Sequence, residues 1–110
     1  MAIIDGDDYL IGRQVLKLIN AEYQRKDLLA LYTNHIRVHD PIYQKVGTCI
    51  DYPLSVQRAR AYRHFSIFPA SHLRTFYVDL YWKIKPRDLK DTRGQYFHAA
   101  NDFAIMMPIL

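Results

Sequence analysis

Three carboxylates follow a short apolar segment near the start of the chain, in the order Asp5-Gly6-Asp7-Asp8 after Ala2-Ile3-Ile4. Side chains two residues apart in an extended chain point the same way, so Asp5 and Asp7 are expected to face one cation. Gly6 between them allows the backbone to turn. Mg²⁺ and Mn²⁺ prefer oxygen ligands and commonly bind protein carboxylates together with substrate phosphates. This acidic end of an expected strand therefore favours a divalent cation that carries a nucleotide diphosphate.

A turn and a helix cap are the alternative interpretation of the same residues. Asp is a common N-cap, so Asp8 would cap the following helix and Asp5-Gly6 would be an ordinary turn. A calcium-binding loop is excluded. Its fifth, sixth and twelfth positions would be Tyr9, Leu10 and Leu16 instead of an acid or amide, Gly and Glu.

Length and composition predict one cytoplasmic domain. The chain has 110 residues, of which 50% are hydrophobic, which suits one core but hardly two. The single cysteine, Cys49, cannot form an internal disulfide, and no N-terminal segment has the pattern of a secretory signal. No stretch approaches the roughly 18 to 20 apolar residues that cross a bilayer, so no transmembrane segment is expected.

The formal net charge of +4 invites comparison with nucleic-acid-binding proteins, in which clustered Lys and Arg gain free energy on phosphate. Here the basic residues lie in small scattered groups, with acids mixed through the last group, so no nucleic-acid partner is expected. His35 and His39 have helical spacing but no accompanying Cys or Glu, and a zinc site is not predicted. Cys49 is interpreted as an incidental thiol.

Hydrophobic spacing predicts an amphipathic helix over residues 11–23 and a strand or strand pair over residues 28–39. The pattern loses its period over residues 41–60, where Gly and Pro interrupt it, and this predicts a long loop. Ser71 is a good N-cap for a helix whose apolar residues keep helical spacing until Pro86 ends it.

The C-terminal part is expected to form a charged turn and an extended segment over residues 88–100, followed by a final helix. Apolar residues of this last part keep helical spacing, and Asp102 lies in the first turn, where the helix dipole favours an acid. Pro108 removes a helical hydrogen bond, so this helix is expected to kink or to stop at Met107. The alternation of strands and helices predicts the α/β class.

Three stretches carry a resemblance to a known family. They are Ile3-Ile4-Asp5-Gly6-Asp7-Asp8-Tyr9-Leu10, Ser71-His72-Leu73-Arg74-Thr75-Phe76 and Ala100-Asn101-Asp102-Phe103-Ala104-Ile105-Met106-Met107-Pro108. The set resembles the second half of the catalytic domain of family 2 glycosyltransferases, the inverting enzymes with a nucleotide-diphospho-sugar transferase fold. The resemblance implies that residues 1–110 are a single partial catalytic domain, with a short mixed sheet and about three helices.

In that family the acidic motif at the strand end holds the metal and the donor nucleotide. The resemblance therefore implies a Mn²⁺ or Mg²⁺ cofactor, with Asp7 as the main metal ligand and Asp5 beside it, next to the donor. Asp8 keeps its expected role as a helix cap.

The other two stretches imply the remaining site residues. Asp102 takes the place of the general base on the acceptor hydroxyl, preceded here by Asn101 where many relatives have Glu. His72 or Arg74 would reach the donor diphosphate or the acceptor. For each of these two residues, the polar face of a capped, solvated helix is the alternative.

The resemblance implies metal-dependent transfer of a sugar, with inversion, from a nucleotide-sugar donor to a hydroxyl of a glycan or other acceptor. The alternative function is an inactive glycosyltransferase remnant that acts as a partner-binding module. A separate chain would supply the nucleotide-binding half. A sheet that begins at residues 1–4 would lack neighbouring strands, so self-association is also expected.

Overall fold

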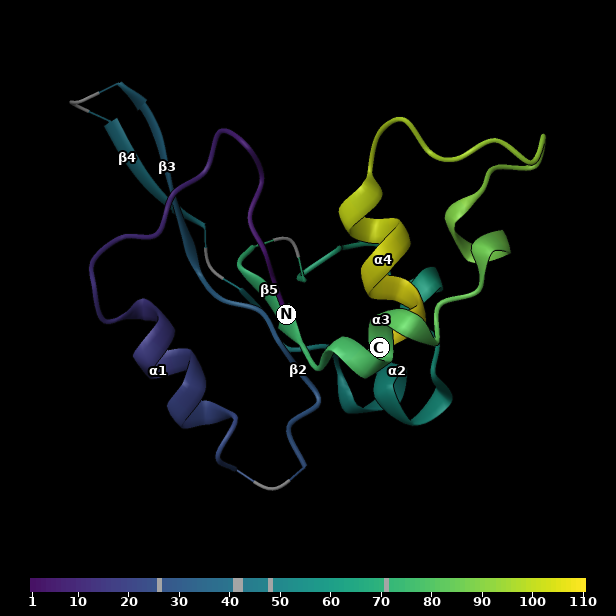
Figure 1. Ribbon diagram of the computed structural model, residues 1–110, viewed down its shortest axis with the longest axis horizontal. Helices are drawn as coiled ribbons and strands as arrows, with labels where there is room; N and C mark the ends of the chain where they lie inside the picture. The colour runs from purple at the N-terminus through teal and green to yellow at the C-terminus, as the bar shows by residue number, and fades with distance from the viewer. Residues whose placement is uncertain (26, 41–42, 48, 71) are drawn as a thin grey trace.

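The computed structural model describes residues 1–25, 27–40, 43–47, 49–70 and 72–110. Within these ranges the chain combines short α-helices with a three-stranded and a two-stranded sheet, so the predicted mixture of helices and strands is confirmed. The three-stranded sheet lies between α1 on one side and α3 and α4 on the other (Figure 1). The helices are α1 (Val15–Glu22), α2 (Leu54–Ala59), α3 (Val78–Trp82) and α4 (Asn101–Ile109), with 3-10 turns η1 (Tyr62–His64) and η2 (Pro86–Leu89).

The larger sheet has the order β1 (Ala2–Ile3), β5 (Arg74–Phe76) and β2 (Ala30–Leu31). Thr75 in the central strand lies opposite Ala2 on one side and Leu31 on the other, and both pairings are antiparallel. The described sheet is therefore antiparallel instead of mixed as predicted.

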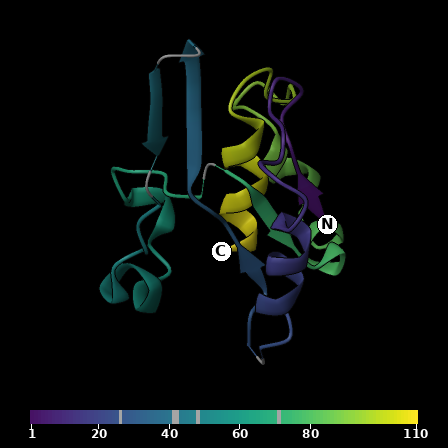
Figure 2. The same cartoon turned by 90° about the vertical axis from the view of Figure 1, so that its left-hand side faces the viewer.

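A β-hairpin projects from this body (Figure 2). It consists of β3 (His35–Asp40) and β4 (Tyr43–Gly47), which pair antiparallel from His35 opposite Gly47 onward. The strand pair predicted over residues 28–39 is confirmed as β2 and β3, although the two strands belong to different sheets.

Strand β5 connects the two sides of the body because successive side chains alternate across a sheet. Its three residues are all buried. The Thr75 hydroxyl is hydrogen-bonded to the Tyr23 hydroxyl just beyond α1, at 3.0 Å. Phe76 packs with Ala70 and with Met106 of α4 in the core cluster. The central strand thus positions both α1 and α4.

The helix predicted after Ser71 is wrong in its first half. Residues Arg74–Phe76 are strand, and the helix α3 covers only Val78–Trp82. The apolar spacing in this segment suits a helix, but pairing with β1 and β2 buries all three residues of β5, and this tertiary pairing overrides local spacing. Ser71 itself lies outside the described residues.

The long loop predicted over residues 41–60 is also wrong, because β4 and α2 lie within it. The final helix is confirmed, but it continues past Met107 to Ile109. Pro108 lies in the last turn, where the loss of a backbone hydrogen bond disrupts less helix than it would in the middle.

The first helix begins at Val15 instead of residue 11, and Gln14 occupies its N-cap. Asp8 lies well before that position, so its predicted role as a helix cap is wrong. The extended segment predicted before α4 is represented by the bridge between Lys90 and Tyr96. Among the described residues, no helix has the length and apolar character needed to span a bilayer.

Candidate functional site

A tight turn after β1 shapes the acidic motif. The Asp8 backbone N–H donates a hydrogen bond to the Asp5 carbonyl oxygen at 3.0 Å. This turn brings together the first and fourth residues of the motif, whereas the sequence prediction assumed an extended chain that pairs Asp5 with Asp7. Gly6 does not have a positive φ, so the turn does not depend on the conformational freedom of glycine.

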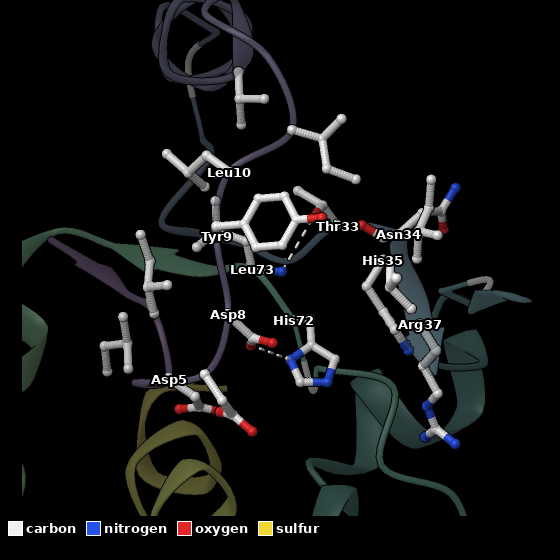
Figure 3. Close-up of a pocket in the computed structure, with 17 residues that line it drawn as sticks. Asp5, Asp8, Tyr9, Leu10, Thr33, Asn34, His35, Arg37, His72 and Leu73 are labelled. Carbon is white, nitrogen blue, oxygen red and sulfur yellow. Dashed lines mark hydrogen bonds and ion pairs between the residues drawn. The ribbon is translucent and has the colours of Figure 1, made fainter. Parts of the chain in front are cut away.

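His72 completes a group of three side chains with Asp5 and Asp8. The His72 Nδ1 atom lies 3.6 Å from Asp8 Oδ2, and one donor atom from each residue lies within 4.8 Å of the other two (Figure 3). Asp7 lines the same pocket but does not belong to this group. The sequence prediction therefore named Asp5 and His72 among these residues, but not Asp8 as a ligand.

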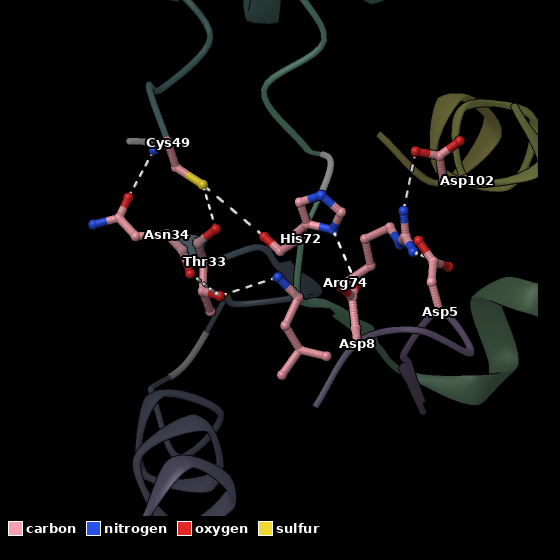
Figure 4. Close-up of polar contacts among 9 residues, drawn as sticks. Asp5, Asp8, Thr33, Asn34, Cys49, His72, Arg74 and Asp102 are labelled. Atoms are coloured by element: carbon pink, nitrogen blue, oxygen red, sulfur yellow. Dashed lines mark hydrogen bonds and ion pairs between the residues drawn. The ribbon is translucent and has the colours of Figure 1, made fainter. Parts of the chain in front are cut away.

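Thr33 fixes the segment that carries His72. The Thr33 backbone N–H donates to the His72 carbonyl oxygen at 2.7 Å, and the Leu73 N–H donates to Thr33 Oγ1 at 3.0 Å. These contacts join the segment after β2 to the segment before β5 (Figure 4). His72 thus comes from ordered backbone beside the central strand.

Arg74 connects the first and third sequence motifs. Its side chain is 1% exposed, with Nη2 2.7 Å from Asp5 Oδ1 and Nη1 3.0 Å from Asp102 Oδ2 (Figure 4). A buried guanidinium requires charge partners, which these carboxylates supply. In this arrangement Arg74 holds Asp5 and Asp102 in position and does not face the pocket.

The pocket beside the acidic turn has a volume of about 600 Å³ and is lined from the turn, the start of α1, β3 and the segment before β5. Asp5, Asp7, Asp8 and His72 all line it. Asp102 does not line this pocket, and the Arg74 guanidinium connects it to Asp5. The structure therefore brings all the predicted site residues into one region, with Asp102 at its edge.

His35 also lines the pocket, although the sequence analysis considered it only for a zinc site that was not predicted. Its ring meets the His72 ring edge-on, with the ring centroids 4.4 Å apart. Burial lowers the pKa of His35, and the nearby charges of His72 and Arg37 lower it further. Gly47 in β4 lies against the ring, where a Cβ atom would overlap it. No local pattern identifies a contact between residues so far apart in the sequence.

Cys49 supports the backbone of this region. Its thiol contacts the Thr33 carbonyl oxygen, and its N–H donates to the Asn34 side-chain oxygen at 2.7 Å. Burial raises the pKa of the thiol, and the charge of Asp51 raises it further, so the unreactive protonated form is favoured. The interpretation of Cys49 as a thiol without a catalytic role agrees with this environment.

No protein-family model matches this sequence, and searches of curated proteins and of solved structures also returned no match.

Proposed function

We propose that this protein is a metal-dependent glycosyltransferase, which moves a sugar with inversion from a nucleotide-diphosphate donor to an acceptor hydroxyl. The observation that carries the proposal is the meeting of the three stretches that resemble the family. Arg74 of the second stretch contacts Asp5 of the first and Asp102 of the third, and His72 contacts Asp8. This contact between residues distant in the sequence supports the proposal, because a shared site needs groups from all three stretches.

The donor atoms of Asp5, Asp8 and His72 suit a divalent cation. These atoms lie within 4.8 Å of one another, whereas two ligands of one ion with bonds of about 2.1 Å are at most about 4.2 Å apart. A shared ion would therefore draw these partly exposed side chains closer together. Carboxylates suit Mg²⁺ and Mn²⁺, but an imidazole nitrogen is a poor ligand for Mg²⁺. This donor set favours Mn²⁺ within the proposed pair of cofactors.

The proposed transfer forms a bond between the acceptor oxygen and the anomeric carbon while the bond from that carbon to the diphosphate oxygen breaks. Asp102 takes the proton of the acceptor hydroxyl. A divalent cation, when bound, stabilises the negative charge of the leaving diphosphate. Arg74 keeps the base at a fixed distance from the acidic turn.

Release of nucleoside diphosphate from a panel of nucleotide sugars, measured with Mn²⁺ and candidate acceptors, tests this proposal. Asp102→Asn should lower turnover by roughly two to four orders of magnitude, as for other general bases, with little change in donor binding. Asp79→Asn is the matched control, because Asp79 is an exposed acid in α3, outside the pocket. Turnover that stays near the parent value in Asp102→Asn would remove the general base from the proposal.

A partner-binding module without activity is the second candidate, and the exposed apolar side chains favour it. Leu18 and Trp82 are 65% and 74% exposed, whereas few hydrophobic residues of the described chain are fully buried. Large exposed apolar surfaces commonly mark interaction sites. If the protein neither consumes nor binds a nucleotide sugar, the partner-binding function is favoured over the enzyme function.

A further inference from the structure

The pocket beside the acidic turn has an apolar wall that the proposed sugar transfer does not use. Several of the large hydrophobic side chains exposed in this protein line this one pocket. They come from two segments far apart in the sequence, and they are Ile4, Tyr9, Ile11, Ile36 and Val38. The diphosphate and the hydroxyl groups of a nucleotide sugar need polar partners, which this wall does not offer.

Polar groups line the same pocket, and Figure 3 shows the Asp5 and Asp8 carboxylates, the imidazole rings of His35 and His72, and the Arg37 guanidinium. Arg37 lines the pocket with an exposed side chain, and no ion pair joins it to a residue whose side chain the structure describes. Next to it, the buried Nδ1 atom of His35 has no hydrogen-bond partner within the described part of the chain. Both groups are suited to an anion, and a guanidinium is well suited to phosphate or carboxylate.

We propose that this pocket binds an amphiphilic anion as the second ligand of the site. Its phosphate or carboxylate headgroup contacts Arg37 and His35 beside the metal site, and its apolar group lies along Ile36, Val38 and Ile4. This inference rests on the proposed function only in placing a divalent cation at Asp5 and Asp8. The volume of about 600 Å³ is within the range of small-molecule pockets, roughly 300 to 1,000 Å³.

Alkyl phosphates of increasing length provide a direct test. Titration calorimetry with inorganic, butyl, hexyl and octyl phosphate, below micelle-forming concentrations and with Mn²⁺ present, should show tighter binding with each added CH₂. The expected gain is about two- to fourfold per CH₂, as for burial of apolar surface elsewhere. Equal affinity for all four phosphates would overturn the proposal and would leave metal and nucleotide binding, and hence the proposed function, untouched.

Exposed residues of the wall allow substitutions that spare the fold. Ile36→Ser and Val38→Ser should remove most of the dependence on chain length while keeping the affinity for inorganic phosphate. Arg37→Gln should lower the affinity for all four phosphates by a similar factor. Leu54→Ser is the matched control, because Leu54 is an exposed leucine in α2 that lies outside this pocket. If the affinity also stopped depending on alkyl-chain length in Leu54→Ser, this result would contradict the assignment of Ile36 and Val38 to the apolar wall.

Two further measurements distinguish this ligand from a second copy of the chain and from a membrane surface as the group that covers the wall. Sedimentation at increasing protein concentration would show association that Ile36→Ser abolishes if a second copy covers the wall, and this result would overturn the proposal. Binding to phosphatidic acid vesicles without binding to soluble alkyl phosphates would overturn it in favour of a membrane surface.

Discussion

Arg74 determines how the candidate site is assembled, because its buried guanidinium pairs with carboxylates from both ends of the chain. Asp5 and Asp102 are partly exposed, at 47% and 31% of their side chains, so water reaches both partners. The ion pairs therefore contribute less to stability than a fully buried triad would. Their main consequence is geometric, since they hold the acidic turn against the first turn of α4.

Replacement of Arg74 tests this positioning. Arg74→Gln should lower the free energy of unfolding by about 2 to 3 kcal/mol, somewhat less than the loss of a partner from a fully buried pair. Urea denaturation measures the change. Arg93→Gln is the control, because Arg93 is 80% exposed in its pair with Asp91 and its loss should cost less than about 1 kcal/mol. Equal effects of the two substitutions would contradict the role of Arg74.

Tyr52 gives a second prediction for a single residue. Its ring packs edge-on against Tyr62, and its buried hydroxyl has no hydrogen-bond partner among the described residues. Burial raises the pKa of Tyr52 from 10.0 to about 12, with further contributions from Tyr32 and Tyr62. The unfolded chain then loses the phenol proton first as pH rises, so this residue lowers stability above pH 10, progressively up to about pH 12.

Tyr52→Phe removes that titration. The variant should match or exceed the parent in stability at neutral pH, because no hydrogen bond is lost. Between pH 10 and 12 its advantage should grow. Thermal melts across this pH range measure the difference, and a constant difference at all pH values would show that the Tyr52 phenol ionises as easily in the folded protein as in the unfolded chain.

Contacts between elements decide which side chains reach the pocket. The β3–β4 hairpin carries His35 to His72, and Gly47 opposite His35 leaves space for the ring. Gly47→Ala should destabilise the protein by about 1 to 3 kcal/mol, as overpacking does elsewhere. His35→Ala in the same chain should recover much of this loss, because it removes the overlapping ring. A double-mutant cycle by denaturation measures this coupling, and Gly6→Ala, where a Cβ meets no atom within 4 Å, is the control.

The elements also show how far the sequence could predict this fold. Helix α4 was predicted because Phe103, Met106 and Met107 keep a local spacing, and Asp102 was correctly placed in its first turn. Strand β5 was missed because its burial depends on pairing with β1 and β2, which no local pattern encodes.

The candidate site also divides into features that local motifs predict and features that depend on contacts between distant residues. Asp5, His72, Arg74 and Asp102 were predicted as site residues from their motifs, and the structure places them near one another. The contact of Asp8 with His72 was not predicted, because it joins residues from opposite halves of the chain. The sequence prediction assumed an extended chain at the acidic motif, but the structure has a turn there. Because of this turn, Asp8 and not Asp7 lies beside Asp5.

At the scale of the whole molecule, the described core is small and much apolar surface remains exposed. β1 and β2 are the outer strands of the larger sheet, each paired on one side only in the described sheet. Light scattering over a concentration series should therefore show self-association. Leu18→Lys should reduce it, because Leu18 is 65% exposed on α1 and does not line the pocket beside the acidic turn. A monomer at every concentration would contradict this prediction.

The candidate metal group of Asp5, Asp8 and His72 joins the two halves of the chain and is the centre of the proposed function. Asp8→Asn and Asp7→Asn separate the two assignments of the acidic motif. If the turn seen here holds the cation, Mn²⁺ affinity should fall strongly in Asp8→Asn and little in Asp7→Asn. The reverse result would favour the extended arrangement predicted from the sequence.

Electron paramagnetic resonance of Mn²⁺ with a nucleoside diphosphate tests this claim most directly, because it reports both binding and ligand type. The parent protein should bind one Mn²⁺, and spin-echo modulation should detect an imidazole nitrogen that disappears in His72→Gln. Asp79→Asn, which alters an acid outside the pocket, should bind as the parent does. Absence of Mn²⁺ binding in the parent, or a nitrogen signal that persists without His72, would contradict the account.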